Sequence, residues 1–234
     1  MADRKSNRRK KIENPISEGI ATETNLQVPK EEKRKLYPAS IVSINWDALN
    51  TKRKVSEELK LEISELYLDI QKKPSAHIER LKQLIEEYPD IQIFSGYLLM
   101  AYILEEDEKA GEIAKSLYNK YPDYMFGKIG FIESAIHNQD LDSIPNFLDN
   151  KFDYKELFPQ RGAFHIVEIL LFYFSIGRYY AFKNQPDLAK NYLKEIKSID
   201  EEQVLLKKLQ SDIDKGAGVK FYQKVLRKFK SKES

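Results

Sequence analysis

Residues 170–203 read LLFYFSIGRYYAFKNQPDLAKNYLKEIKSIDEEQ, and this stretch decides the fold that the sequence predicts. Apolar and aromatic side chains dominate its first half, and in its second half apolar residues recur among charged ones with the spacing of an amphipathic helix. Gly177 and Ala189 carry little or no side chain, so two paired helices can approach each other closely there. The rings of Tyr173 and Tyr180 fill the gaps between helix turns. The stretch therefore predicts two helices packed against each other.

The tripeptide Tyr-Pro-Asp marks the next feature, because it occurs at residues 88–90 and again at residues 121–123, an interval of 33 residues. Proline restricts the residue before it and cannot continue a helix, so each tripeptide predicts a helix end. An apolar stripe at helical spacing precedes the first tripeptide, made of Ile78, Leu81, Leu84 and Ile85. An interval of roughly 20 to 50 residues is typical of repeat proteins.

These residues resemble the tetratricopeptide repeat, a unit of roughly 34 residues that folds into two antiparallel helices. Residues 170–203 match the motif of that family closely and depart from it at Glu201, where the family has proline. Residues 91–124 match in part, residues 75–90 resemble the second helix of an earlier unit, and residues 125–159 fit in outline. The matching residues are Tyr173, Ile176, Gly177, Tyr180, Ala189, Leu193 and Ile196 in the close match, and Phe94, Tyr97, Ala110 and Pro122 in the partial one.

The resemblance implies an all-α fold, an antiparallel helical-hairpin solenoid, and the composition agrees because 9 glycines and 9 prolines are too few for a turn-rich β-sandwich. We expect the repeat domain to cover residues 55–214, with residues 55–73 and 201–215 as its capping helices. Residues 36–54 are apolar without a clean helical period and hold the only tryptophan. They are interpreted as an extended lead-in that packs on the domain.

Both ends of the chain are basic. Residues 1–35 contain 10 Lys and Arg against 6 Asp and Glu, and residues 215–234 contain 7 against 1, whereas residues 36–214 have a net charge of −8. We expect residues 1–35 to be a disordered tail and residues 219–234 to form a basic amphipathic helix after a glycine hinge. The basic residues singled out are Arg4, Lys5, Arg8, Arg9, Lys10 and Lys11 at one end and Lys220, Lys224, Arg227 and Lys228 at the other.

These tails have several interpretations. They can be solvated segments that bind nothing, or they can bind the phosphates of DNA or RNA. The C-terminal helix can also dock on this protein or a partner, which we favour, or lie on an anionic membrane.

Several chemical classes are excluded or lack candidate residues. The chain has no cysteine, which excludes disulfides, thiolate metal sites and cysteine nucleophiles. It has no nucleotide-binding glycine motif, and its one His-x-x-Glu pair, His165 and Glu168, is half of what a di-iron site requires. We therefore expect no metal, no cofactor and no catalysis. No apolar stretch has the length of a membrane span, and the basic start lacks the apolar core of a secretory signal, so we expect a cytoplasmic protein.

The resemblance also implies a binding surface, because the first helix of each repeat lines a concave groove in that family. By position, the predicted groove residues are Gln92, Ser95, Leu99, Tyr102 and Ile103 in one repeat and Leu171, Phe174, Arg178, Ala181 and Phe182 in another. Such a groove suits a hydrophobic peptide or an amphipathic helix with an acidic residue opposite Arg178. The alternative is that these side chains belong to the core. The predicted function is a protein–protein interaction scaffold or adaptor of unknown partner, and the alternative is a nucleic-acid-associated protein that uses its basic tails.

Overall fold

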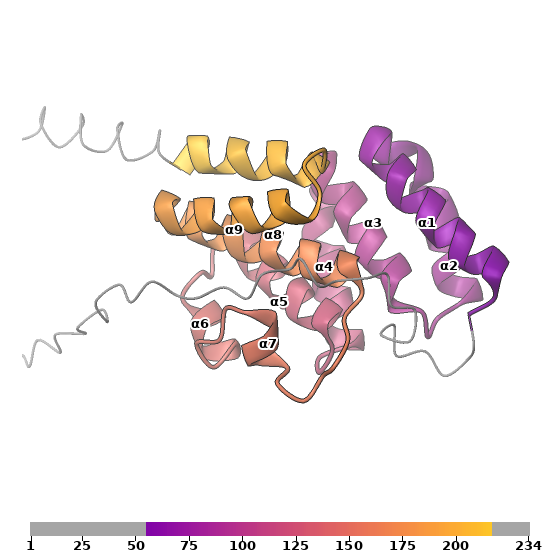
Figure 1. Ribbon diagram of the computed structural model, residues 1–234, viewed down its shortest axis with the longest axis horizontal. Helices are drawn as coiled ribbons and strands as arrows, with labels where there is room; N and C mark the ends of the chain where they lie inside the picture. Colours follow the sequence, from indigo (N-terminus) through magenta and orange to yellow (C-terminus); the bar gives the residue numbers. More distant parts are fainter. Residues whose placement is uncertain (1–54, 217–234) are drawn as a thin grey trace, which may run out of the picture. The chain divides into compact units, whose positions relative to one another are not determined.

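The computed structural model describes residues 55–216, in which all regular structure is helical (Figure 1). The all-α fold class is thus confirmed for this part of the chain. The helices are α1 (Glu57–Lys72), the 3₁₀ helix η3 (Pro74–His77), α2 (Ile78–Glu87), α3 (Gln92–Leu104), α4 (Lys109–Lys120), α5 (Met125–His137), α6 (Ser143–Phe147), α7 (Tyr154–Leu157), α8 (Ile166–Phe182) and α9 (Pro186–Ile199), followed by a helical segment over residues 204–216.

The N-terminal tail, the lead-in and the C-terminal basic helix that the sequence predicts lie outside the described residues, and so do all ten basic tail residues named above. Within residues 55–216, none of the helices has the length and hydropathy that a membrane span requires.

Local sequence signals explain where the helices begin and end. The side chain of Ser56 accepts a hydrogen bond from the backbone N–H of Leu59 at 3.2 Å and so caps α1, which ends at Lys72 just before Pro74. Helices α2 and α4 both end at the residue before a Tyr-Pro-Asp tripeptide. The Tyr121 hydroxyl donates to the Pro89 carbonyl at 2.7 Å, so the two tripeptide turns contact each other.

The predicted close approach of two helices at Gly177 is present. A Cβ atom at this position would lie 2.7 Å from Leu209 Cδ2 and 3.3 Å from Tyr192 Cβ, the latter on α9. Ala189 on α9 is fully buried as well. Helices α8 and α9, joined by residues 183–185, thus form a tightly packed hairpin, and the segment 204–216 packs on it (Figure 1).

The core is formed by α3, α5 and α8, which contact one another and are buried on nearly every side. A helix that is apolar all round belongs in the interior of a fold. The two ends of the helical array also meet: Gln203 donates to the hydroxyl of Tyr67 on α1, and the Val204 N–H donates to Gln71 Oε1 at 3.4 Å. These two hydrogen bonds join α1 to residues 203 and 204, which lie more than 130 positions later in the chain.

Candidate binding cleft

The structure places the predicted groove residues at three locations. Because α3, α5 and α8 pack against one another, the side chains of these helices that face inward belong to the core. Buried in this way are Gln92, Leu99, Leu171, Phe174 and Ala181. Ser95 is partly buried and lines a separate hollow beside α2 and α4. The other four, Tyr102, Ile103, Arg178 and Phe182, come together at one cleft.

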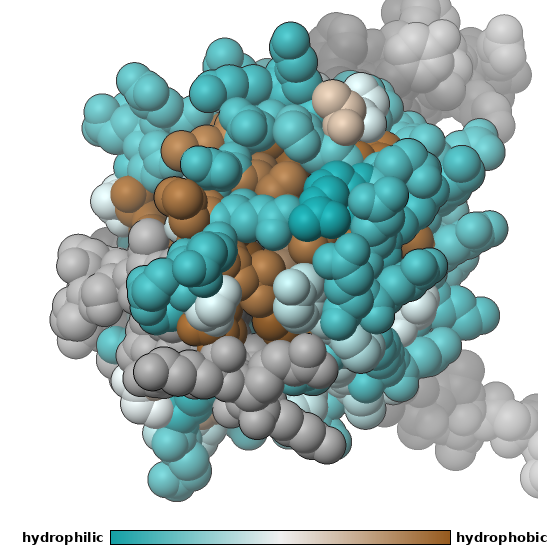
Figure 2. Space-filling view, turned by 90° about the vertical axis from the view of Figure 1, so that its right-hand side faces the viewer, coloured by the Kyte–Doolittle hydropathy of each residue, from teal (hydrophilic) through white to brown (hydrophobic). Residues whose placement is uncertain are grey.

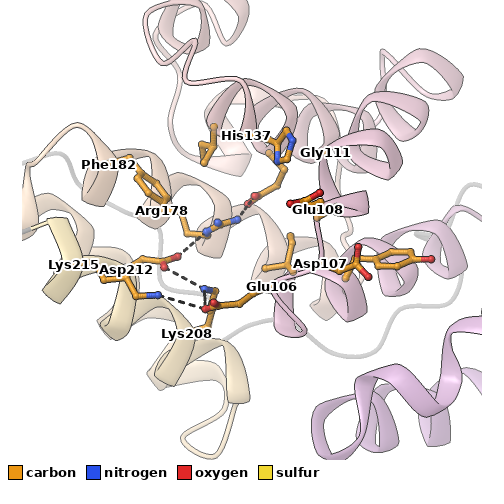
Figure 3. A pocket seen from close by; sticks show the side chains of 15 residues that line it. Glu106, Asp107, Glu108, Gly111, His137, Arg178, Phe182, Lys208, Asp212 and Lys215 are labelled. Atoms are coloured by element: carbon orange, nitrogen blue, oxygen red, sulfur yellow. Dashed lines mark hydrogen bonds and ion pairs between the residues drawn. The ribbon is translucent and has the colours of Figure 1, made fainter.

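This candidate binding cleft, called the binding cleft below, has a volume of about 380 Å³ and lies among α3, the α3–α4 loop, the start of α4, α5, α8 and the segment 204–216 (Figure 3). Phe182 at its edge is 47% exposed. Sequence reasoning did not find the other lining residues, which are Glu106, Asp107, Glu108, Ala110, Gly111, Glu133, Ile136, His137, Lys208, Asp212 and Lys215.

The α3–α4 loop brings acidic side chains to the rim. Glu106 has a φ of 54°, in the left-handed region that non-glycine residues seldom adopt, and the chain turns there. The backbone N–H of Asp107 then donates to the Tyr102 carbonyl at 3.0 Å, and the Asp107 carboxylate accepts from the Lys109 N–H at 2.8 Å. The loop is therefore held by its own hydrogen bonds.

A charged network runs along the floor of the cleft (Figure 3). Arg178 donates to Glu133 through Nη1 and to Asp212 Oδ2 through Nε, the latter at 2.8 Å. Lys208 Nζ lies 3.3 Å from Asp212 Oδ1 and 2.6 Å from Glu106 Oε1. Four of these five residues belong to α5, α8 and the segment 204–216, so the network ties these elements to the loop.

The electrostatic environment of Glu133 is unusual because its side chain is buried. Burial raises the pKa of this carboxyl group, and the nearby Arg178 opposes the rise. Its Oε1 atom has no hydrogen-bond partner among the described residues. One buried acceptor of the network is thus unsatisfied.

The cleft as a whole carries more negative than positive side chains. Its acidic residues are Glu106, Asp107, Glu108, Glu133 and Asp212, and its Lys and Arg residues are Arg178, Lys208 and Lys215. Since Arg178 is already bound by two carboxylates of the same chain, it does not offer the unpaired cation that the sequence suggested. The charge that complements this cleft is positive.

The His-x-x-Glu pair has a structural role at the start of α8. Glu168 accepts from the His165 N–H at 2.9 Å, and His165 Nδ1 accepts from the Val167 N–H at 3.3 Å, which forms a capping box. Arg161 donates to both carboxylate oxygens of Glu168. Within residues 55–216, no cluster of three or more His, Asp or Glu side chains is placed to hold a metal ion.

Acidification is expected to destabilise the protein through this cap. Burial lowers the pKa of His165 to about 4 from its ordinary 6.5, and a charged imidazole could not accept the Val167 N–H bond. Below pH 6.5 the His165 imidazole of the unfolded chain binds a proton, whereas in the folded protein it stays neutral down to about pH 4. The free energy of unfolding therefore falls as the pH drops from about 6.5 to about 4, by about 2 to 3 kcal/mol. Urea unfolding at several pH values across this range measures how steeply the free energy of unfolding depends on pH.

The control for this prediction is His165→Asn, which keeps a side-chain acceptor at the cap but does not titrate. The raised pKa values of the buried carboxyls Glu133 and Glu168 act in the opposite direction, but they are present in both proteins and largely cancel in the comparison. Equal pH slopes for the two proteins would contradict the role given to His165.

Comparison with known proteins gave no relatives: no protein-family model matches the chain, and neither the curated proteins nor the solved structures include a significant match.

Proposed function

We propose that this protein is a non-catalytic cytoplasmic scaffold of the tetratricopeptide type, and that its binding cleft takes a protein segment in which a lysine or arginine neighbours an apolar residue. The observation that carries the proposal is the excess of carboxylates in a cleft whose rim exposes Phe182. A basic group entering the cleft would meet favourable charge, and its apolar neighbour would cover the phenyl ring.

The repeat character is supported by two features. Helices α8 and α9 pack closely around Gly177, as the motif at residues 170–203 implies. The Tyr-Pro-Asp turns, separated by one repeat length, contact each other through Tyr121 and Pro89. Equivalent turns of neighbouring units would lie side by side in such an array.

The pairing of the charged side chains supports binding over catalysis. Arg178, Lys208 and Lys215 all contact carboxylates of the cleft itself, so these groups hold one another in place. Glu108 at the rim is exposed and, unlike Glu106, forms no ion pair with Lys208 or Lys215, so its carboxylate is open to an incoming cation. The proposal therefore gives the network a positioning role and gives the rim the contact with the partner.

Site-specific crosslinking tests the proposal in cells. A benzophenone amino acid replaces Phe182, and the same replacement at Tyr124, which is 39% exposed and does not line the cleft, is the control. We expect position 182 to crosslink to a defined protein segment that contains Lys or Arg, and position 124 not to do so. Crosslinks from position 182 to segments without basic residues would overturn the proposal.

Reversal of the rim charge gives the quantitative prediction. Glu108→Lys should lower the crosslinking yield from position 182 at least about tenfold, because like charges brought together at an interface cost several kcal/mol. Glu112→Lys makes the same charge change in the first turn of α4 but does not line the cleft. It should have a much smaller effect, and equal losses in the two variants would contradict a contact at Glu108.

The alternative function, nucleic-acid binding by the basic tails, remains a prediction from the sequence.

A further inference from the structure

A second cavity, of about 300 Å³, lies where α1 meets the start of α8 and the end of α9. We name it the α1 pocket. Its lining is largely apolar and consists of Ile63, Ser64, Tyr67, Leu68, Tyr97, His165, Ile166, Val167, Ile199 and Asp200. Figure 2 shows apolar side chains gathered on the face where α1 and α2 lie at the right of Figure 1, with polar side chains around them.

Helix α1 has apolar residues on two sides. Its inner side is buried and consists of Leu59, Ile63, Leu66 and Ile70. Leu61 and Leu68 are seven residues apart and therefore share another side of the helix. They are 60% and 55% exposed, respectively. Leu68 also lines the α1 pocket, so the exposed side and the pocket are continuous. Apolar side chains on two sides of a helix are typical of a helix that is covered on both sides.

Two tyrosine rings give the α1 pocket an aromatic wall. The rings of Tyr67 and Tyr97 stack with their centroids 6.1 Å apart. Their hydroxyls already have partners, since Tyr97 donates to the Ile63 carbonyl at 3.2 Å and Tyr67 accepts from Gln203. This wall can therefore make apolar contacts and stack with a ring, which suits a flat aromatic side chain as the occupant.

We propose that the α1 pocket is the docking site for residues 36–54 of this same chain, and that Trp46 enters it. This segment carries seven large apolar side chains, Leu36, Tyr37, Ile41, Val42, Ile44, Trp46 and Leu49, and joins the described domain immediately before α1. Eight residues lie between Trp46 and Val55, which makes nine Cα-to-Cα steps. At about 3.3 Å per residue they reach about 30 Å, farther than the roughly 24 Å length of α1.

The size of the surface favours a segment of the same chain over a second copy. A stable interface between proteins buries about 800 Å² on each partner, whereas this site consists of two exposed leucines and a small cavity. A tethered segment needs less contact area because its effective concentration near the site is high.

Tryptophan fluorescence of the full-length protein tests the proposal directly, because the chain contains 1 tryptophan. In the folded protein we expect the emission maximum of Trp46 to be blue-shifted, and acrylamide quenching to be weaker, relative to the same chain in denaturant. Two variants should block the site: Leu68→Lys places a charge at its edge, and Ser64→Arg fills it from the surface of α1. Both should lose the blue shift and the protection from acrylamide while far-UV circular dichroism stays unchanged.

The matched control is Phe182→Lys, which replaces another exposed large apolar residue at the other cleft and should leave Trp46 emission unaltered. Emission like that of the denatured chain in the folded protein would overturn the proposal, as would a shielded Trp46 that neither variant exposes. Shielding that appears only as protein concentration rises would assign the site to a second copy. None of these readouts depends on the partner of the binding cleft.

Discussion

Replacement of Gly127 by alanine is expected to lower the free energy of unfolding by about 3 to 5 kcal/mol, a large part of the roughly 5 to 15 kcal/mol that stabilises a typical domain. Gly127 lies in the first turn of α5 against the second Tyr-Pro-Asp turn. A Cβ atom there would lie 1.7 Å from the carbonyl oxygen of Tyr121 and 3.2 Å from Pro122 Cα. These are backbone atoms, so relief requires α5 to move away from the turn that precedes it.

Gly162→Ala provides the matched control, because a Cβ atom at Gly162 would meet nothing within 4 Å. It should leave stability unchanged or raise it by about 0.4 to 1 kcal/mol, since alanine restricts the unfolded chain. Urea unfolding, monitored by circular dichroism, compares the stability of the two variants. Similar midpoints for both variants would show that α5 is not fixed against the turn at residues 121–123.

The structure around this turn was predictable from the sequence only in part. Proline chemistry made the helix ends at both Tyr-Pro-Asp tripeptides predictable, because it acts on adjacent residues. The need for glycine at position 127 was not predictable, because it depends on how α5 leaves the turn in three dimensions. The closure of the array through Tyr67 and Gln203 was likewise out of reach, since these residues are separated by 136 positions.

The binding cleft was predictable in part. The repeat motif assigns Tyr102, Arg178 and Phe182 to one groove, and all three line the same cleft. The motif does not tell which of the other predicted groove residues belong to the core. The sequence does contain a signal for the charged network. Glu133 is the only Asp, Glu, Lys or Arg of α5 after Lys128. Arg178 is likewise the only such residue of α8 after Glu168. Isolated opposite charges in two apolar helices predict a buried pair.

Replacement of Arg178 by methionine should therefore destabilise the protein by about 3 to 5 kcal/mol at neutral pH, because it leaves the carboxylates of Glu133 and Asp212 buried without their shared cation. Methionine keeps much of the side-chain volume, so the loss reports charge more than packing. Arg178 lowers the pKa of Glu133, so this pKa should be higher in the variant. The carboxyl should then bind a proton more readily, and the deficit relative to the wild type should shrink as pH falls.

The triple variant Arg178→Met, Glu133→Gln and Asp212→Asn separates the stability of the network from the function of the cleft. With the buried charges removed together, neutral groups of similar shape should restore most of the stability lost in the single variant. The excess of carboxylates over Lys and Arg in the cleft would fall from two to one, because two acidic residues and one basic residue are lost. A triple variant that stays as unstable as Arg178→Met would mean that Arg178 acts through packing. One that regains stability but crosslinks its basic partner less efficiently would show that the same carboxylates that bind Arg178 give the cleft its preference for positive charge.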